Sequence, residues 1–252
     1  MGPDAVGGPS VVVVEDADEL GRVSADLVAE RIAAVPEAWV AVATGETPMG
    51  LYAELAARCR SGRLDPSRVT PVQLDEYLGL EPDDRRTFFG WMRRSFLEPL
   101  GIADERVVRL PLDGDLAAAC AAFDRTLDAR GGIDLAILGI GTNGHLGFNE
   151  PPADRDAPTR AVDLTPATIG SNARYWGGVD DVPTRAVTTG MRQLLAARAI
   201  VMVVSGPTKR EIVHRALEEP VTPQVPASVL QEAVADVTVV VDREAWGTGD
   251  PP

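Results

Sequence analysis

Short apolar runs alternate with amphipathic stretches from one end of the chain to the other. Runs rich in Val, Ile and Ala, typical of buried strands, cover residues 11–14, 39–43, 69–74, 106–110, 134–140, 199–204 and 237–241. Between them, apolar residues that recur every three or four positions predict helices over 17–35, 48–59, 88–97, 116–130 and 207–217. This alternation predicts an α/β, Rossmann-like fold, with a mostly parallel sheet covered by helices on both faces.

The chain shows no internal repeat, low-complexity tract or linker, so we predict a single domain over residues 11–246. Residues 1–10 and 247–252 are expected to be flexible tails. The first ten residues lack the features of a signal peptide, and no apolar run approaches 18 residues. We therefore expect a cytoplasmic protein without a membrane segment.

Charge narrows the range of partners. The 252 residues carry 24 Lys and Arg against 38 Asp and Glu, a formal net charge of −14. Among the cations there is a single lysine, Lys209, and the only histidines are His145 and His214. An acidic chain without basic clusters is poorly suited to nucleic acid or to an anionic membrane, because both require clustered cations.

The sequence predicts neither a metal nor a cofactor. Cys59 and Cys120 are far apart and fit no metal-ligand spacing, so we interpret both as small apolar side chains. The chain also lacks a dinucleotide fingerprint, a Walker loop and a cluster of metal ligands.

Three loops that follow predicted strands carry candidate chemistry, since ligands of α/β sheets bind beyond the carboxyl ends of the strands. In the loop 43–48 (ATGETP), a glycine and a helix start could receive phosphate; the alternative is an ordinary turn capped by Thr. Asp75 follows the strand 69–74, where a carboxylate could act as a base or cap a turn.

The third loop, 138–151 (LGIGTNGHLGFNEP), places four glycines around His145 and close to Glu150. A solvated loop does not need so many glycines and polar groups close together. The alternative for His145 is a partly buried ring that is simply hydrogen-bonded. His214 lies in a predicted helix among charged residues, and we interpret it as a surface or edge residue.

This third loop resembles the signature of the glucosamine-6-phosphate deaminases, also called isomerases: GxG, then Asp or Asn, then GHxGFNEP. Other blocks are similar to the family in its order and spacing from about residue 11 to 242: a TGxTP phosphate loop at 44–48, MDEYxGL at 74–80, the SNSR segment of a mobile lid at 171–174, and a final phosphate-binding turn at 206–209. The resemblance thus implies a small lid, at about residues 163–182.

The resemblance implies an aldose–ketose isomerisation with deamination. D-Glucosamine 6-phosphate is ring-opened, a proton moves from C2 to C1, and ammonia leaves to give D-fructose 6-phosphate, in amino sugar catabolism. By motif position, Asp75 would shuttle the proton and His145 would open the ring, flanked by Asn143 and Glu150. A carboxylate can reach both carbons, and a neutral imidazole can accept at one nitrogen while the other donates.

The same resemblance implies that the substrate is bound by the phosphate loop, by one glycine of the third loop and by two cations. These residues are Thr44, Gly45, Glu46, Thr47, Gly139, Arg174 and Lys209. Glu46 stands where the family more often has a small or neutral residue, so its carboxylate must point away or pair with an arginine. The family pattern admits Asp in place of Asn143, and we expect Asn to stabilise a charged imidazole less well.

Three alternatives remain open. A 6-phosphogluconolactonase-type hydrolase shares a similar fold, although the residues FNEP and Asp75-Glu76-Tyr77 favour the deaminase. Glu46 leaves open a deaminase for another amino sugar phosphate. A non-catalytic sugar-phosphate sensor would need a DNA-binding motif, and only about ten residues precede the first predicted strand. The sequence does not set the oligomeric state, and a homo-oligomer is compatible with it.

Overall fold

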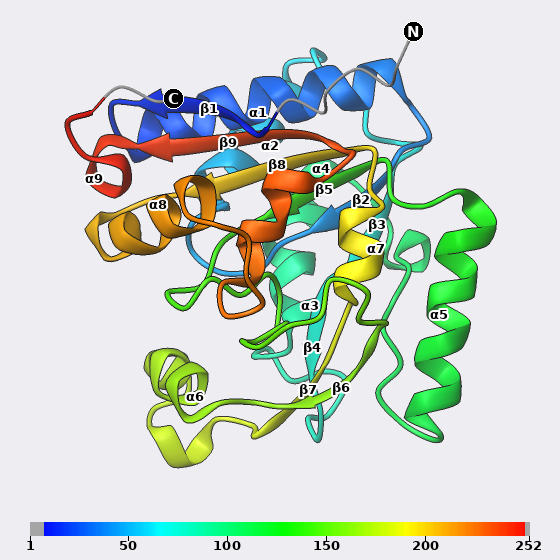
Figure 1. Ribbon diagram of the computed structural model, residues 1–252. Helices are drawn as coiled ribbons and strands as arrows, with labels where there is room; N and C mark the ends of the chain where they lie inside the picture. The colour runs from blue at the N-terminus through cyan, green and yellow to red at the C-terminus, as the bar shows by residue number, and fades with distance from the viewer. Residues whose placement is uncertain (1–7, 250–252) are drawn as a thin grey trace, which may run out of the picture.

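A six-stranded parallel sheet forms the centre of the structure, a computed structural model that describes residues 8–249 (Figure 1). Every neighbouring pair of its strands is parallel. In spatial order the strands are β1 (Ser10–Val14), β9 (Asp236–Asp242), β8 (Ala199–Val204), β5 (Leu135–Leu138), β2 (Trp39–Val42) and β3 (Thr70–Gln73). Six of the seven predicted strands are thereby confirmed, with ends shifted by two residues at most.

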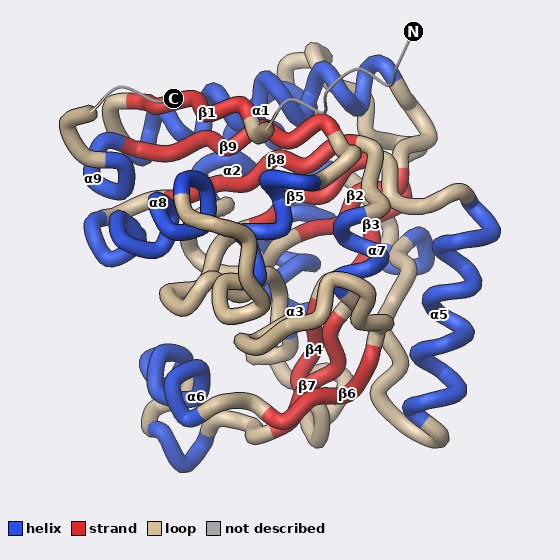
Figure 2. The backbone as a smooth tube through the Cα atoms, in the orientation of Figure 1, coloured by secondary structure: helices blue, strands red, loops and turns tan. Residues whose placement is uncertain are grey.

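Helices cover both faces of this sheet (Figures 1 and 2). One face carries α1 (Ala17–Ala34), α2 (Met49–Arg60), α3 (Phe88–Met92), a π-helical turn (Arg93–Leu97) and α4 (Glu98–Leu100). The other carries α5 (Leu116–Arg130), α7 (Met191–Leu195), α8 (Arg210–Glu218) and α9 (Arg243–Trp246).

Strand β5 shows why the sheet needs both layers. Leu135 and Ile137 pack against the first layer of helices, whereas Ala136 and Leu138 pack against the second. A central parallel strand is buried on both faces, so its side chains are apolar without alternation. The predicted Rossmann-like α/β fold is confirmed.

A second sheet, which the sequence pattern did not predict, lies beyond the carboxyl edge of the first (Figure 2). Its antiparallel strands are, in order, β4 (Asp75–Tyr77), β7 (Arg185–Thr188) and β6 (Arg160–Asp163). Only Leu74 separates β3 from β4, so the chain passes directly from one sheet to the other. The segment between β6 and β7 contains the short helix α6 (Pro166–Asn172).

The predicted strand over 106–110 is wrong. Residues Asp104–Arg106 form a 3-10 turn, and only one bridge, between Val72 and Val108, joins the segment to β3. The neighbouring Pro71 has no N–H with which to extend the ladder. The Leu110 N–H donates to the Gln73 side-chain oxygen at 3.2 Å instead of to the backbone of β3. One apolar run therefore docks on the sheet without becoming a strand.

The predicted tails fall mostly outside the described residues, since 1–7 and 250–252 are not described. Of the tail residues that are described, Ser10 belongs to β1, and the carbonyl of Gly249 accepts a hydrogen bond of 3.1 Å from the Trp246 indole. Within residues 8–249, no helix is both long and apolar enough to cross a membrane.

Glu76 ties the second sheet to the first layer of helices. Its side chain is fully buried, and its carboxylate accepts from the amides of Tyr77, Phe88 and Phe89 at 2.9, 2.9 and 2.8 Å. Gln73 adds a fourth donor at 2.9 Å. Two of these amides belong to the first turn of α3, which a negative charge stabilises.

We predict that Glu76→Leu lowers the free energy of unfolding by about 3 kcal/mol or more, because it leaves several buried donors without an acceptor. Urea denaturation followed by circular dichroism measures the change. The matched control is Glu81→Leu at an exposed position, which should stay within about 0.5 kcal/mol of the parent. Equal stability of the two variants would contradict the role given to Glu76.

Candidate active site

The predicted loops meet at the carboxyl edge of the parallel sheet. The loop 43–48 leaves β2, Asp75 follows β3, and the loop 139–150 leaves β5. From β2 the chain continues outward to β3, whereas from β5 it continues to β8 and β9 on the other side. The strand order therefore reverses between β2 and β5, and such a switch point is where α/β sheets bind ligands.

Asp75 lies buried at the junction of the two sheets. Its Oδ1 accepts from the Thr188 hydroxyl at 2.6 Å and from the Phe148 amide at 3.0 Å. Burial raises the pKa of Asp75 to about 6, although these two hydrogen bonds and the nearby His145 oppose the rise. Within residues 8–249, Oδ2 accepts no hydrogen bond, so one oxygen is anchored and the other can exchange a proton.

His145 faces the carboxylate of Glu150, with 3.4 Å between Nδ1 and Oε2. The same Oε2 accepts from Asn143 Nδ2 at 2.6 Å, and Oε1 accepts from the Thr168 hydroxyl. Burial raises the pKa of Glu150, but the nearby charge of His145 and the hydrogen bonds from Thr168 and Asn143 outweigh this effect and bring the pKa to about 2. Glu150 is therefore an anion at neutral pH that can orient the imidazole.

Asn143 contacts the backbone of His145 and the Glu150 carboxylate rather than the imidazole. Its Oδ1 accepts from the backbone N–H of His145 at 3.2 Å, and its amide group donates to Glu150. Asn143 therefore acts on the ring only through the carboxylate it holds.

Two glycines make room for these side chains. A Cβ on Gly141 would lie 2.4 Å from the His145 ring, and one on Gly147 would lie 2.9 Å from Asp75 Oδ1. Gly147 also has a φ of +58°, a backbone conformation that favours glycine. The glycine-rich loop thus lets the imidazole and the carboxylate pack directly against the backbone.

The loop 43–48 and the segment after α6 meet over the start of α2. Gly45 has a φ of +104°, and no side chain caps α2 at Pro48. Glu46 pairs with Arg174, with 3.2 Å between Oε2 and Nη2. Of the two alternatives expected for the Glu46 carboxylate, pointing away or pairing with an arginine, the structure shows the pairing.

Lys209 approaches the same edge from the turn after β8. Its Nζ donates to the Ile140 carbonyl at 2.6 Å, and burial together with the charge of Arg174 lowers its pKa. The turn is held by Asp242, whose carboxylate accepts from the Ser205 hydroxyl at 2.5 Å and from the Gly206 amide at 3.1 Å. Lys209 and Arg174 therefore lie in the same region of an acidic protein, close to the start of α2, where an anion would be favoured.

The structure brings Asp75, Asn143, His145 and Glu150 together through direct contacts or a shared loop. It gives no side-chain hydrogen bond to Thr44 or Thr47 among the described residues, so their predicted role rests on the position of the loop. A Cβ on Gly139 would meet nothing within 4 Å, which leaves the space beside this residue open.

The other singled-out residues lie outside this edge. His214 is half-buried, and its Nε2 lies 2.8 Å from the Trp246 carbonyl and its Nδ1 3.1 Å from Glu218. Cys59 and Cys120 are free thiols, half-buried and buried. The structure thus agrees with the interpretation of the two cysteines as small apolar side chains and of His214 as an edge residue.

Sequence reasoning missed Thr168, Thr188 and Asp242, which hold functional groups in place. Thr188 and Thr168 belong to the second sheet and to α6, neither of which was predicted. A signal existed only for Asp242, a carboxylate directly after a predicted strand, like Asp75.

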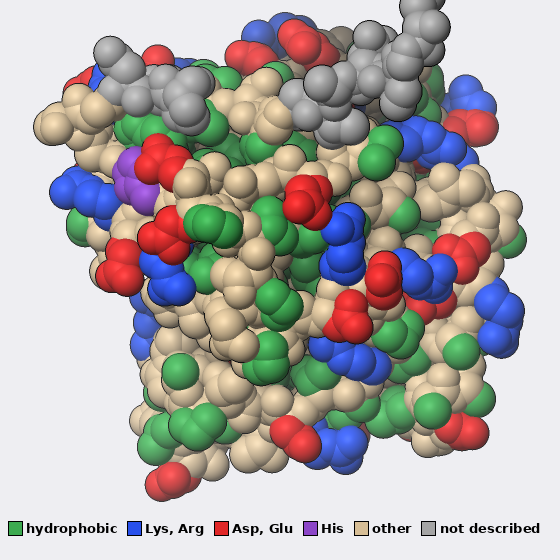
Figure 3. Space-filling view, in the orientation of Figure 1, with side chains coloured by type: hydrophobic (Ala, Val, Ile, Leu, Met, Phe, Trp, Pro, Cys, Tyr) green, Lys and Arg blue, Asp and Glu red, His purple; other side chains and the backbone are tan. Residues whose placement is uncertain are grey.

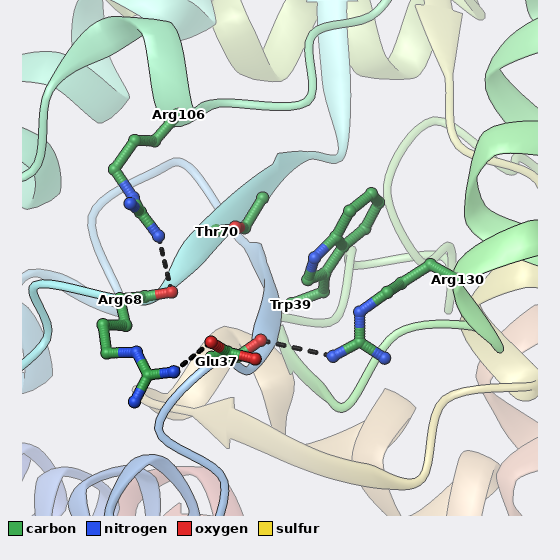
Figure 4. A pocket seen from close by; sticks show the side chains of 6 residues that line it. All are labelled: Glu37, Trp39, Arg68, Thr70, Arg106 and Arg130. Carbon is green, nitrogen blue, oxygen red and sulfur yellow. Dashed lines mark hydrogen bonds and ion pairs between the residues drawn. The ribbon is translucent and has the colours of Figure 1, made fainter.

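A cleft of about 250 Å³ lies at the opposite, amino edge of the sheet (Figure 4). Three arginines line it, but Arg106 donates to the Val69 and Arg68 carbonyls at 3.0 and 2.6 Å, and Arg68 pairs with Glu37. Arg130 reaches the Glu37 carbonyl at 3.3 Å. These cations serve as structural ties between loops, far from the carboxyl ends of the strands.

The distribution of charge on the face shown in Figure 3 does not point to another centre. On the face seen in Figure 3, Lys and Arg are interspersed with Asp and Glu and form no continuous basic area. No group of three or more His, Cys, Asp or Glu that could hold a metal occurs within residues 8–249.

Comparison with known proteins shows the family of the chain. The model of the family described as glucosamine-6-phosphate isomerases/6-phosphogluconolactonase matches residues 15–239. A glucosamine-6-phosphate deaminase of Halothermothrix orenii is 38% identical over 237 residues, which cover 93% of this chain and 98% of the relative. Another, of Streptomyces avermitilis, is 41% identical over 239 residues, 93% of this chain and 90% of the relative.

Comparison with solved structures shows that the fold is also similar to that of known proteins. A monomeric glucosamine-6-phosphate deaminase matches with a TM-score of 0.90 and 35% identity, over 94% of this chain and 98% of that one. A 6-phosphogluconolactonase from Leishmania guyanensis matches with a TM-score of 0.76 at 20% identity, over 97% and 99% of the two chains, a likeness of fold alone. Sequence and structure agree that the chain belongs to the family of glucosamine-6-phosphate isomerases and 6-phosphogluconolactonases.

Proposed function

We propose that this protein is a glucosamine-6-phosphate deaminase, which converts D-glucosamine 6-phosphate into D-fructose 6-phosphate and ammonia. The observation that carries the proposal is the pairing of His145 with an ionised Glu150, on the same sheet edge as the buried Asp75. The curated relatives described above bear the name of this activity. We assign it to residues 11–246, with a lid at about 163–182.

Ring opening falls to His145. The ring Nδ1 faces the Glu150 carboxylate, so the opposite nitrogen, Nε2, is available to move a proton between the C1 hydroxyl and the ring oxygen. The anionic Glu150 stabilises the imidazolium that forms when the ring accepts this proton.

Isomerisation falls to Asp75. A base that removes a proton from C2 and returns it to C1 needs an ionised oxygen and a pKa near the working pH. Burial supplies the raised pKa, Thr188 and the Phe148 amide hold Oδ1, and Oδ2 carries the proton. The proton transfer leaves an iminium at C2. A water molecule adds its oxygen to C2, the C2–N bond breaks, and ammonia leaves to give fructose 6-phosphate.

The phosphate is held by a few placed donors. Arg174 offers a planar fork and Lys209 a point charge, next to the backbone of Thr44–Thr47 at the start of α2. Gly45 and Gly139 let the backbone approach the substrate closely. Local cations thereby overcome the field of a chain of charge −14.

The direct test is to incubate the protein with glucosamine 6-phosphate and to measure ammonia and fructose 6-phosphate. We expect both products in equal amounts. Parallel assays with 6-phosphogluconolactone and galactosamine 6-phosphate examine the hydrolase and the other amino sugar. Preferred turnover of either would replace the proposed substrate, and tight binding without turnover would favour a sensor.

We predict that kcat/KM falls as the pH drops below about 6, because Asp75 must be ionised to act as a base and its pKa is raised to about 6. Thr188→Val removes a donor to the carboxylate, raises the pKa of Asp75 further and moves this acidic limb to higher pH. The control Thr184→Val alters an exposed threonine near the same strand. If the acidic limb of the pH profile does not move in Thr188→Val, the limb does not report the ionisation of Asp75.

We predict that Lys209→Ala raises KM for glucosamine 6-phosphate at least tenfold, because the phosphate loses an ion pair. A tenfold change corresponds to a loss of about 1.4 kcal/mol of binding free energy. Steady-state kinetics measure the change. Arg63→Ala removes an exposed cation beyond the far end of α2 and makes the same change in net charge, so its KM should match the parent. A KM near that of the parent in Lys209→Ala would refute the phosphate role.

A further inference from the structure

A hydroxyl group from the lid meets the catalytic pair. Thr168 lies in the first turn of α6, within the segment that links β6 to β7, and its side chain is buried. Its Oγ1 donates to Glu150 Oε1. The cap of α6 is made by another residue, Thr165, whose hydroxyl accepts from the Thr168 amide at 3.2 Å. The Thr168 hydroxyl is therefore not needed to cap the helix.

The two oxygens of Glu150 are held from opposite sides. Oε2 accepts from Asn143 and faces His145, both on the loop after β5, whereas Oε1 is held by the lid. A carboxylate fixed at both oxygens keeps one orientation, which is the requirement for a group that must direct an imidazole. The charged groups near His145 are Glu150 and, on β4, Asp75.

The same short segment also contacts the phosphate end. Arg174 pairs with Glu46 in the loop after β2, and Asn172 donates to the Tyr77 hydroxyl at 3.0 Å. The ring of Tyr175 stands edge-on to Trp91, with 5.5 Å between their centres. Residues 168–175 thus contact both ends of the site at once.

We propose that Thr168 is a positioning residue for ring opening, because its hydroxyl, supplied by the lid, holds the Glu150 carboxylate against His145. The Thr168 hydroxyl already donates to Glu150 in the structure, in which Arg174 pairs with Glu46. The inference rests on the proposed function for its catalytic consequence, whereas the contact itself belongs to the free protein.

The kinetic test compares Thr168→Val, which keeps the branched shape and removes the hydroxyl, with Thr168→Ser, which keeps the hydroxyl. We expect Thr168→Val to lower kcat about tenfold with KM changed less than about twofold, and Thr168→Ser to recover most of the loss. Thr184→Val is the matched control at an exposed position after the lid, and it should behave like the parent. A loss confined to KM, or no rescue by Ser, overturns the proposal.

A double-mutant cycle separates positioning from general damage to the lid. In the Glu150→Gln background the partner of the hydroxyl is already altered, so adding Thr168→Val should lower kcat by less than about twofold. Full additivity of the two losses would show that Thr168 acts elsewhere.

A third measurement does not depend on turnover. The chain has only two histidines, so the ring resonances of His145 and His214 can be followed by nuclear magnetic resonance in the free protein. We expect the His145 signals to move in Thr168→Val and to return in Thr168→Ser, with His214 as the internal reference. Unmoved His145 signals contradict the proposal, whereas a parent protein inactive on glucosamine 6-phosphate contradicts the proposed function instead.

Discussion

The burial of the Asp75 carboxylate is the constraint on which the rest of the site depends. The chain passes from the parallel sheet to the antiparallel one with a single residue between them, and Asp75 is the first residue after that passage. Burial at this junction removes the water that would hydrate an ionised carboxylate. The hydrogen bonds from the Thr188 hydroxyl and the Phe148 amide replace only part of that hydration. A weakly compensated carboxylate is a stronger base than a solvated one, so the architecture itself produces the reactivity.

Two carboxylates in one site, Asp75 buried and Glu150 half-buried, therefore acquire opposite properties. Asp75, with one oxygen hydrogen-bonded, has a pKa raised to about 6, whereas Glu150, held at both oxygens beside an imidazole, has a pKa of about 2. Environments that separate the pKa values of like groups separate their roles, one exchanging protons and the other remaining charged. The glycines at 141 and 147 make this division feasible, because any side chain there would displace the imidazole or the base.

The sequence was sufficient for the parallel sheet and for the loops at its edge. Long apolar runs such as 199–204 are typical of central strands, and Asp75, His145 and Glu150 lie in the segments that follow such strands. The second sheet escaped prediction because β4 reads Asp-Glu-Tyr, a polar run whose burial depends on partners more than 100 residues away. For the same reason Thr188 and Thr168 could not be found, since a hydroxyl shows its acceptor only after the chain has folded.

The ion pair between Glu46 and Arg174 sets a limit on substrate affinity. In the proposed phosphate site, a substrate phosphate would compete with the Glu46 carboxylate for the Arg174 guanidinium, so the affinity would reflect the difference between two anions. Because both side chains are largely exposed, the internal pair is worth only about 1 kcal/mol or less. That cost is small enough for a dianion to displace the carboxylate, and large enough to disfavour ligands that carry a single weak charge.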